Sequence, residues 1–171
     1  MKKITIVIAA LAIVIGASAF NPEPDSNLLD PRSANAVDAS KVTYKVSSAF
    51  TAKFKQAKKV SWRQVEDFYF AYFEINDKNY SAAYSAQGEM IAISRTVPAA
   101  QLPLAVVSIL EERFADYKIP ANVTEIAMEG STNYYFTIEG ATRLLQLKCS
   151  ADGYIDVQKK IKKKVLVGSV S

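Results

Sequence analysis

The chain of 171 residues contains no histidine and one cysteine, and these shortages exclude several kinds of site. Without histidine there can be no His-based catalytic triad, no His–metal site and no histidine proton shuttle. A single cysteine cannot form an internal disulfide. The alternating pattern Leu145-x-Leu147-x-Cys149 predicts a small, buried apolar residue at Cys149, with a reactive thiol or an intermolecular bridge as the alternatives.

Glycine is also scarce, and the motifs of common catalytic sites are missing. The six glycines are scattered at turns, so the chain has neither a glycine-rich phosphate loop nor a Gly-x-Ser-x-Gly nucleophile motif. Neighbouring carboxylates at Glu66-Asp67 and Glu111-Glu112 point in different directions and do not make a catalytic dyad. Asp77-x-Asn79 lacks the further oxygen ligands of a calcium loop. We therefore expect a protein that is not an enzyme and holds no metal or cofactor.

The N-terminus has the three parts of a secretory signal peptide. A basic start, Met1-Lys2-Lys3, precedes an apolar run over residues 4–15 and the small-x-small site Ala17-Ser18-Ala19. We expect cleavage after Ala19, a periplasmic or secreted location and no stable membrane span afterwards; an uncleaved anchor is the alternative. The proline-containing residues 20–44 predict a flexible linker, and residues 164–171 a C-terminal tail.

The positive charge of the chain is concentrated near its C-terminus. The formal charge of +4 falls to +2 without residues 1–19, and to −3 without the five lysines of residues 159–164. We therefore do not expect nucleic-acid binding. The lysine cluster is consistent with contact to anionic lipid or polysaccharide, or with an edge strand protected against aggregation.

Hydrophobic periodicity predicts two helices and eight strands. The first helix would be capped by Ser47 or Ser48 and bury Phe50, Phe54 and Ala57. The second runs from Leu102 to Tyr117, with Pro103 in its first turn. The predicted strands cover residues 60–65, 68–75, 80–85, 89–95, 123–128, 134–139, 143–150 and 154–161.

The helix and its four strands occur twice. Phe114 matches Phe50 at 64 positions later, and the turn Ser150-Ala151-Asp152-Gly153 matches Ser85-Ala86-Gln87-Gly88 at 65 positions later. The pattern predicts an α+β fold of two tandem α-ββββ repeats, residues 45–97 and 98–163. Together the repeats would form one antiparallel sheet with the helices packed on one face.

The second copy assigns the faces of the strands in the first. Tyr134, Phe136 and Ile138 alternate with polar residues, so the apolar set should face a helix. Carried to the first copy, the helix-facing set is Tyr69, Ala71, Phe73, Tyr80, Ala82 and Tyr84. The candidate partner-binding residues on the open face are Phe70, Tyr72, Ile91, Ile93, Tyr135 and Tyr154. The alternatives are that the tail, the linker or a homodimer partner covers this face.

Several structural motifs resemble a known family. They are Val60-x-Trp62, Tyr69-x-Ala71-x-Phe73, Tyr80-x-Ala82-x-Tyr84, Gly88-Glu89, Leu102-Pro103 and Tyr117-Lys118-Ile119. Over residues 45–163 the chain resembles the β-lactamase-inhibitor-like, PepSY-like periplasmic proteins. The resemblance implies two α-β repeats that share one antiparallel sheet, with a sheet face free to bind. The family name comes from fold similarity to an inhibitor of β-lactamase, so it does not imply inhibition here. The chain also lacks the disulfides of that inhibitor.

Together these features predict an exported, non-enzymatic binding module of the cell envelope that recognises a protein or peptide through the open face of its sheet. A PepSY-type regulator or inhibitor of an envelope peptidase is one alternative. A structural envelope protein that self-associates through the same face, as a homo-oligomer, is another.

Overall fold

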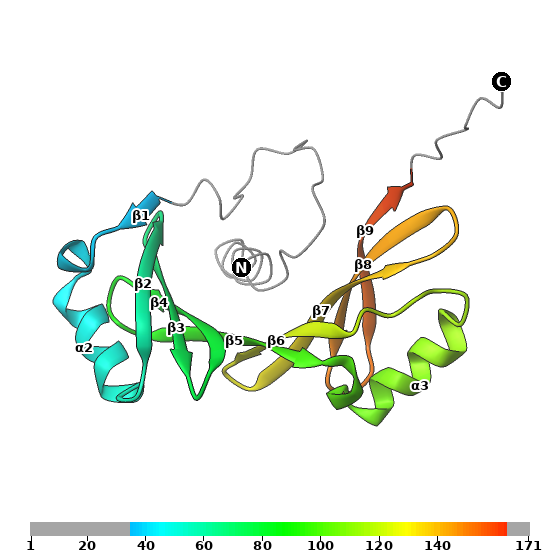
Figure 1. The fold of residues 1–171 in the computed structure, drawn as a ribbon, viewed down its shortest axis with the longest axis horizontal. Coiled ribbons are helices and arrows are strands. Elements are labelled where there is room, and N and C mark those ends of the chain that lie inside the picture. Colours follow the sequence, from blue (N-terminus) through cyan, green and yellow to red (C-terminus); the bar gives the residue numbers. More distant parts are fainter. Residues whose placement is uncertain (1–34, 164–171) are drawn as a thin grey trace, which may run out of the picture. The chain divides into compact units, whose positions relative to one another are not determined.

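The computed structural model describes residues 35–163, and over this range nine strands follow one another as hydrogen-bonded neighbours in one antiparallel sheet (Figure 1). The strands are β1 (Asn35–Val37), β2 (Lys58–Val65), β3 (Phe68–Ile75), β4 (Lys78–Ser85), β5 (Met90–Pro98), β6 (Asn122–Met128), β7 (Ser131–Glu139), β8 (Arg143–Ser150) and β9 (Ile155–Lys162). The helices are α2 (Tyr44–Lys53) and α3 (Leu104–Arg113), with short 3-10 turns η1 (Ala39–Lys41) and η2 (Ala99–Gln101). The predicted α+β class, with one helix and four strands in each repeat, is confirmed.

The end of the predicted linker is structured, which corrects its boundary at residue 44. Strand β1 pairs antiparallel with β2, and Val37 lies opposite Trp62. The carboxylate of Asp38 then caps η1 by accepting a hydrogen bond from the backbone N–H of Ser40 at 2.8 Å. A three-residue strand is too short to show a period in the sequence, so only the pairing reveals it. The predicted signal peptide, the linker up to residue 34 and the tail over 164–171 lie outside the described residues.

Helix α2 begins earlier than predicted. Thr43, and not Ser47 or Ser48, is the N-cap, and its hydroxyl accepts a hydrogen bond from the backbone N–H of Val46. Val46 and Phe50 form the buried side of the helix, and Phe54 ends it.

Helix α3 is shorter than its apolar pattern indicates. Pro103 is its N-cap and Phe114 its C-cap, so the predicted ends Leu102 and Tyr117 lie outside the helix. Leu102 and Phe114 are nevertheless buried in the same core. Apolar spacing reports which side chains are buried, and here burial continues past both helix ends.

The hairpin turns agree with the sequence. Asn76 and Asp77 connect β3 to β4 with φ values of 50° and 58°, the left-handed conformations that asparagine and aspartate tolerate. Gly88 and Gly153 occupy the corresponding later turn of each repeat, with φ values of 85° and 98°.

The chain divides into two compact units, which do not coincide with the predicted repeats. Among the described residues, the first unit comprises residues 35–96 together with Thr124–Ser131, and the second comprises Val97–Val123 and residues 132–163. The predicted boundary at 97/98 would place all of β6 in the second repeat, whereas most of β6 belongs to the first unit.

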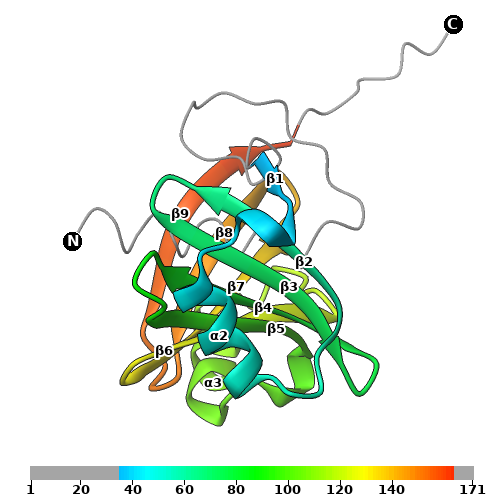
Figure 2. The same cartoon turned by 90° about the vertical axis from the view of Figure 1, so that its left-hand side faces the viewer.

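The core of the first unit lies between α2 and its strands (Figure 2). The ring of Phe50 on α2 lies edge-on to Trp62 at 5.2 Å and to Phe73 at 5.1 Å between centroids. The buried members of this core are Val42, Val46, Phe50, Trp62, Tyr69, Ala71, Phe73, Ala82 and Tyr84, with Tyr80 packed against them. The predicted helix-facing set of the first repeat is thus confirmed.

The second unit repeats this arrangement with α3. Val106 and Leu110 of the helix pack on the alternating apolar residues of β7 and β8. Those strand residues are Tyr134, Phe136, Ile138, Leu145, Leu147 and Cys149, as predicted. Each helix is therefore held by one face of its own strands, which leaves the other face for different contacts.

Candidate binding face

The strands of the first unit present a second face, opposite α2, which we call the helix-distal face. Tyr69 and Ala71 are in the core, so the intervening Phe70 and the following Tyr72 point the other way. The register defines two neighbouring rows on this face across β2–β5: Arg63, Phe70, Ala83 and Ala92, and then Ser61, Tyr72, Ser81 and Ser94. The second row is joined by a hydrogen bond of 3.0 Å between the hydroxyls of Ser81 and Ser94.

Arg63 and Tyr72 form the most distinctive pair on the helix-distal face. The guanidinium carbon of Arg63 lies 5.7 Å from the centre of the Tyr72 ring, within cation–π distance. Burial raises the pKa of the Tyr72 hydroxyl, and the positive charge of Arg63 partly opposes this shift. The hydroxyl therefore stays protonated at neutral pH. The pair offers a guanidinium, a phenol and an aromatic surface together, a combination suited to recognising a polypeptide.

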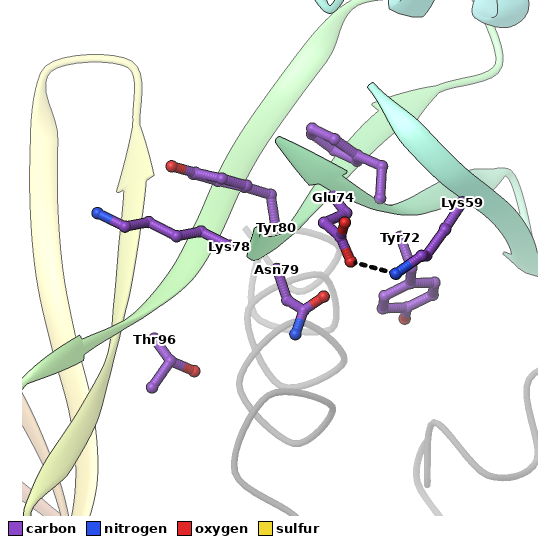
Figure 3. A pocket seen from close by; sticks show the side chains of 8 residues that line it. Lys59, Tyr72, Glu74, Lys78, Asn79, Tyr80 and Thr96 are labelled. Carbon is purple, nitrogen blue, oxygen red and sulfur yellow. Dashed lines mark hydrogen bonds and ion pairs between the residues drawn. The ribbon is translucent and has the colours of Figure 1, made fainter. Parts of the chain in front are cut away.

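An open depression of about 410 Å³, lined in part by Tyr72, lies near the turn of the β3–β4 hairpin (Figure 3). Within it, Lys59 Nζ and Glu74 Oε2 form an ion pair of 2.9 Å beside the ring of Tyr72. The full lining comprises Lys59, Tyr72, Phe73, Glu74, Lys78, Asn79, Tyr80 and Thr96. Lys59 has a φ of 52°, in the left-handed region, where the β2–β3 register is interrupted. The depression supplies charges of both signs and an amide at the edge of the helix-distal face.

Two predicted site residues on β5 are placed differently by the register. Ile93 lies opposite Ala82 and therefore on the helix side, which corrects its predicted position on the open face. It lines a second hollow of about 230 Å³ with Tyr80 and the ion pair between Arg95 Nε and Glu125 Oε1, 2.7 Å apart. Ile91 sits at a β-bulge, because Ala83 pairs with Ala92 while the next residue of β4 pairs with Met90. An inserted residue changes the alternation, and the sequence pattern alone did not reveal it.

Phe70 is on the predicted face but is only 1% exposed. Its neighbours on this face, Ser81, Ala83, Ala92 and Ser94, are buried as well. Alternation assigns a side chain to a face and says nothing about its depth, so the expected exposure of Phe70 was wrong. Phe70 pairs with Arg63 across β2 and β3 and offers little surface of its own.

The other two predicted residues belong to the second unit. Tyr135 lies on β7 opposite Lys148, on the face away from the α3 core, and is half-buried. Burial raises the pKa of its hydroxyl to about 12. Tyr154 precedes β9 and is 70% exposed. A contact role for these two tyrosines stays a prediction.

Neither a metal-ligating cluster nor an accessible thiol lies within residues 35–163. No group of three or more metal-ligating side chains occurs over residues 35–163. Cys149 is fully buried in the second core, and burial raises the pKa of its thiol to about 12, so the thiolate needed for nucleophilic attack is not formed at neutral pH.

Several solved structures from Bacteroides species share the fold. A DUF2874 family protein from Bacteroides uniformis has 17% identity and a TM-score of 0.60, over 70% of this chain and 88% of its own. A BLIP-like protein from Bacteroides fragilis has 17% identity and a TM-score of 0.59, over 74% of this chain and 91% of its own. The chain has a BLIP-like fold.

A candidate periplasmic protein from Bacteroides eggerthii has the same identity, 17%, and a TM-score of 0.60, over 71% of this chain and 88% of its own. No protein-family model and no curated protein matches the chain. At such identity the comparisons show the fold alone. Neither α2 nor α3 is long and apolar enough to cross a membrane, and the described part of the chain offers no other candidate.

Sequence reasoning missed Arg63 and the depression beside it. In the sequence, Arg63 is one polar residue of an ordinary strand. Its proximity to Tyr72 follows from the β2–β3 register, in which Arg63 pairs with Phe70 and reaches diagonally to the next residue on the same face. Only the strand pairing contains that information.

Proposed function

We propose that this protein is an exported, non-enzymatic binding module of the cell envelope. Its helix-distal face would recognise a protein or peptide partner. The observation that carries the proposal is the Arg63–Tyr72 pair beside the depression of the first unit. Arginine and tyrosine are enriched among the residues that dominate protein interfaces, because they give large contact areas and directional donors at modest entropic cost.

The arrangement around the pair favours a polypeptide over a small ligand. Phe70 and the small buried side chains beside it give Tyr72 a fixed support, which lowers the ordering cost of binding. The Lys59–Glu74 ion pair at the margin supplies polar contacts of both signs. Because the neighbouring side chains of β3–β5 are already buried, a partner would contact the accessible Arg63 and Tyr72 and this polar margin.

Export is part of the proposal. The N-terminal pattern of a basic start, an apolar run and Ala17-Ser18-Ala19 supports it, as does the fold shared with a candidate periplasmic protein. A PepSY-type regulator of an envelope peptidase would use the same face with the peptidase as partner. A self-associating structural protein would use it with a second copy of the chain.

Site-specific crosslinking in the producing cells tests the proposed face. A photoreactive amino acid at Asn79, in the depression, should give a discrete adduct, whereas the same probe at the exposed Ser108 of α3 should not. Adding Arg63→Ala or Tyr72→Ala to the Asn79 probe should reduce the adduct at least ~tenfold, because each removes a central interface contact. Glu112→Ala, on the surface of α3, is the matched control and should leave the adduct unchanged.

The mass of the adduct separates the alternatives. Twice the mass of the chain would indicate self-association, and a peptidase in the adduct would indicate the PepSY-type role. Equal adducts from Asn79 and Ser108, or an Asn79 adduct insensitive to Tyr72→Ala and Arg63→Ala, would count against the helix-distal face.

A further inference from the structure

Helix α2 and its flanking segments form a strongly basic outer surface on the first unit. Between residues 41 and 65 the sequence holds seven basic residues and no acidic residue. Lys59 is engaged with Glu74, and Arg63 faces Tyr72. The remaining lysines are all exposed, and with Tyr44 they make up what we call the α2 basic surface: Lys41, Lys45, Lys53, Lys55 and Lys58.

The second repeat shows that this charge is not required by the fold. Helices α2 and α3 share length, position and burial, with Val46 and Val106 both fully buried against their strands. The charged residues of α3 are nevertheless Glu111, Glu112 and Arg113, a net charge of −1, whereas α2 carries Lys45 and Lys53 and no acidic residue. The same packing is therefore compatible with surface charge of either sign, so the burial of α2 does not by itself require its lysines.

The chemistry of the α2 basic surface fits an anionic lipid bilayer. Lysines close to an anionic membrane each strengthen binding, by about fivefold in affinity per residue. Tyr44 is 84% exposed among these lysines, and tyrosine favours the boundary between lipid headgroups and water. Since Val46 and Phe50 hold the apolar side of α2 in the core, the helix would lie on the membrane and not enter it.

We propose that the α2 basic surface docks the first unit onto a bilayer of anionic phospholipid. The uncompensated charge of the surface supports this choice, because no acidic residue lies between residues 41 and 65 to offset its five exposed lysines. The surface is distinct from the helix-distal face, since it lies on the opposite side of the same strands. Membrane docking and partner recognition can therefore occur together.

Vesicle co-sedimentation of the full chain tests the proposal. The readout is a binding ratio: binding to vesicles of phosphatidylglycerol and phosphatidylcholine in equal parts, divided by binding to vesicles of phosphatidylcholine alone. Any binding through the apolar N-terminal run contributes to both measurements. The wild type should favour anionic vesicles, and the preference should fall when added salt shortens the range of electrostatic attraction. Lys45→Gln, Lys53→Gln and Lys55→Gln together should lower the preference at least ~tenfold.

The matched control removes the same charge from the other lysine cluster. Lys159, Lys160 and Lys162 are exposed on β9, and changing all three to Gln alters the net charge equally. This variant should keep most of the preference. Equal losses in the two triple variants, a larger loss in the β9 variant or no preference in the wild type would overturn the proposal. So would retention on immobilised dextran sulfate without binding to anionic vesicles, because the partner would then be an acidic polymer. Circular dichroism would confirm that each variant is folded.

Discussion

At the scale of single residues, Tyr84 is the unusual member of the first core. It is 1% exposed, and its ring packs near Phe50 and Trp62 at 6.4 and 6.3 Å between centroids. Its hydroxyl is buried and has no hydrogen-bond partner among the described residues. An unsatisfied buried hydroxyl reduces stability, because its hydrogen bonds to water in the unfolded chain are not replaced. Tyr84 therefore contributes through its ring, while its oxygen is a cost.

Replacing Tyr84 with phenylalanine should stabilise the protein. The ring contacts remain and the unsatisfied hydroxyl is removed, so the free energy of unfolding should rise by about 1 kcal/mol. Urea denaturation followed by tryptophan fluorescence would measure the change, since Trp62 is the sole tryptophan of the chain. Tyr84→Ala is the control and should lower stability by about 3 to 5 kcal/mol, because it leaves a cavity.

The pH dependence of unfolding gives an independent check. Burial raises the pKa of Tyr84 to about 12 from its ordinary value of 10.0. A pKa raised by folding contributes stability below the unfolded value and loses it as pH increases towards the folded value. Wild-type stability should thus decline above pH 10, and Tyr84→Phe should decline less steeply. A lower stability of Tyr84→Phe at neutral pH would show that the hydroxyl has a partner in solution.

At the scale of elements, the two repeats share a close contact between a glycine turn and a helix. A Cβ on Gly88 would lie 2.7 Å from the carbonyl oxygen of Lys45, and one on Gly153 would lie 3.1 Å from that of Ala105. Both contacts involve the second residue of the helix. The two glycine turns are therefore equivalent and lie 65 positions apart in the sequence, as predicted. The two helices are instead offset by 60 positions, because Phe54 and Phe114 are their C-caps. The predicted match of Phe50 with Phe114 was therefore wrong.

Substitution of Gly88 should be much more damaging than substitution of a glycine in an open turn. Gly88→Ala combines a left-handed backbone with a steric clash and should lower the free energy of unfolding by about 3 kcal/mol. Gly130 has a φ of 71° but no heavy atom within 4 Å of an added Cβ. Gly130→Ala should therefore lower the free energy of unfolding by only about 1 kcal/mol, because it strains the left-handed backbone without causing a steric clash. Chemical denaturation of both variants measures the difference, and equal losses would mean that the turn is not held against α2.

At the scale of the whole molecule, charge and export set the context for binding. The chain has a formal net charge of +4. Its basic residues are not distributed uniformly but cluster around α2 and on β9. Such segregation gives the molecule preferred orientations near a charged surface. Whether it encounters one depends on export, which the N-terminal pattern predicts.

Export should remove the first 19 residues. Mass spectrometry of protein from the producing cells should find a chain that begins at Phe20, because small residues at Ala17 and Ala19 suit signal cleavage. Ala17→Leu combined with Ala19→Leu should block processing, while Ser18→Leu, between the two small positions, should be processed normally. Recovery of chains that begin at Met1 from wild-type cells would favour the uncleaved anchor.

Most of the architecture could be predicted from the sequence, because local patterns respond to local physics. Alternation identified the strands and the helix-facing residues, since a half-buried strand must separate apolar from polar side chains. Asn76-Asp77 and Gly88 marked turns because few other residues adopt left-handed backbone. The second copy, with cleaner alternation, assigned the faces of the first.

The tertiary structure decided which side chains meet and how deep they lie. A bulge at Ile91 shifted the register, so Ile93 turned to the helix side and Ala92 to the helix-distal face. Pairing brought Arg63 over Tyr72, and Phe70 on the same face is only 1% exposed. These outcomes depend on hydrogen bonds between strands far apart along the chain. The sequence by itself determined the elements and their faces, whereas register and depth belong to the assembled sheet, because each requires a partner that no local pattern specifies.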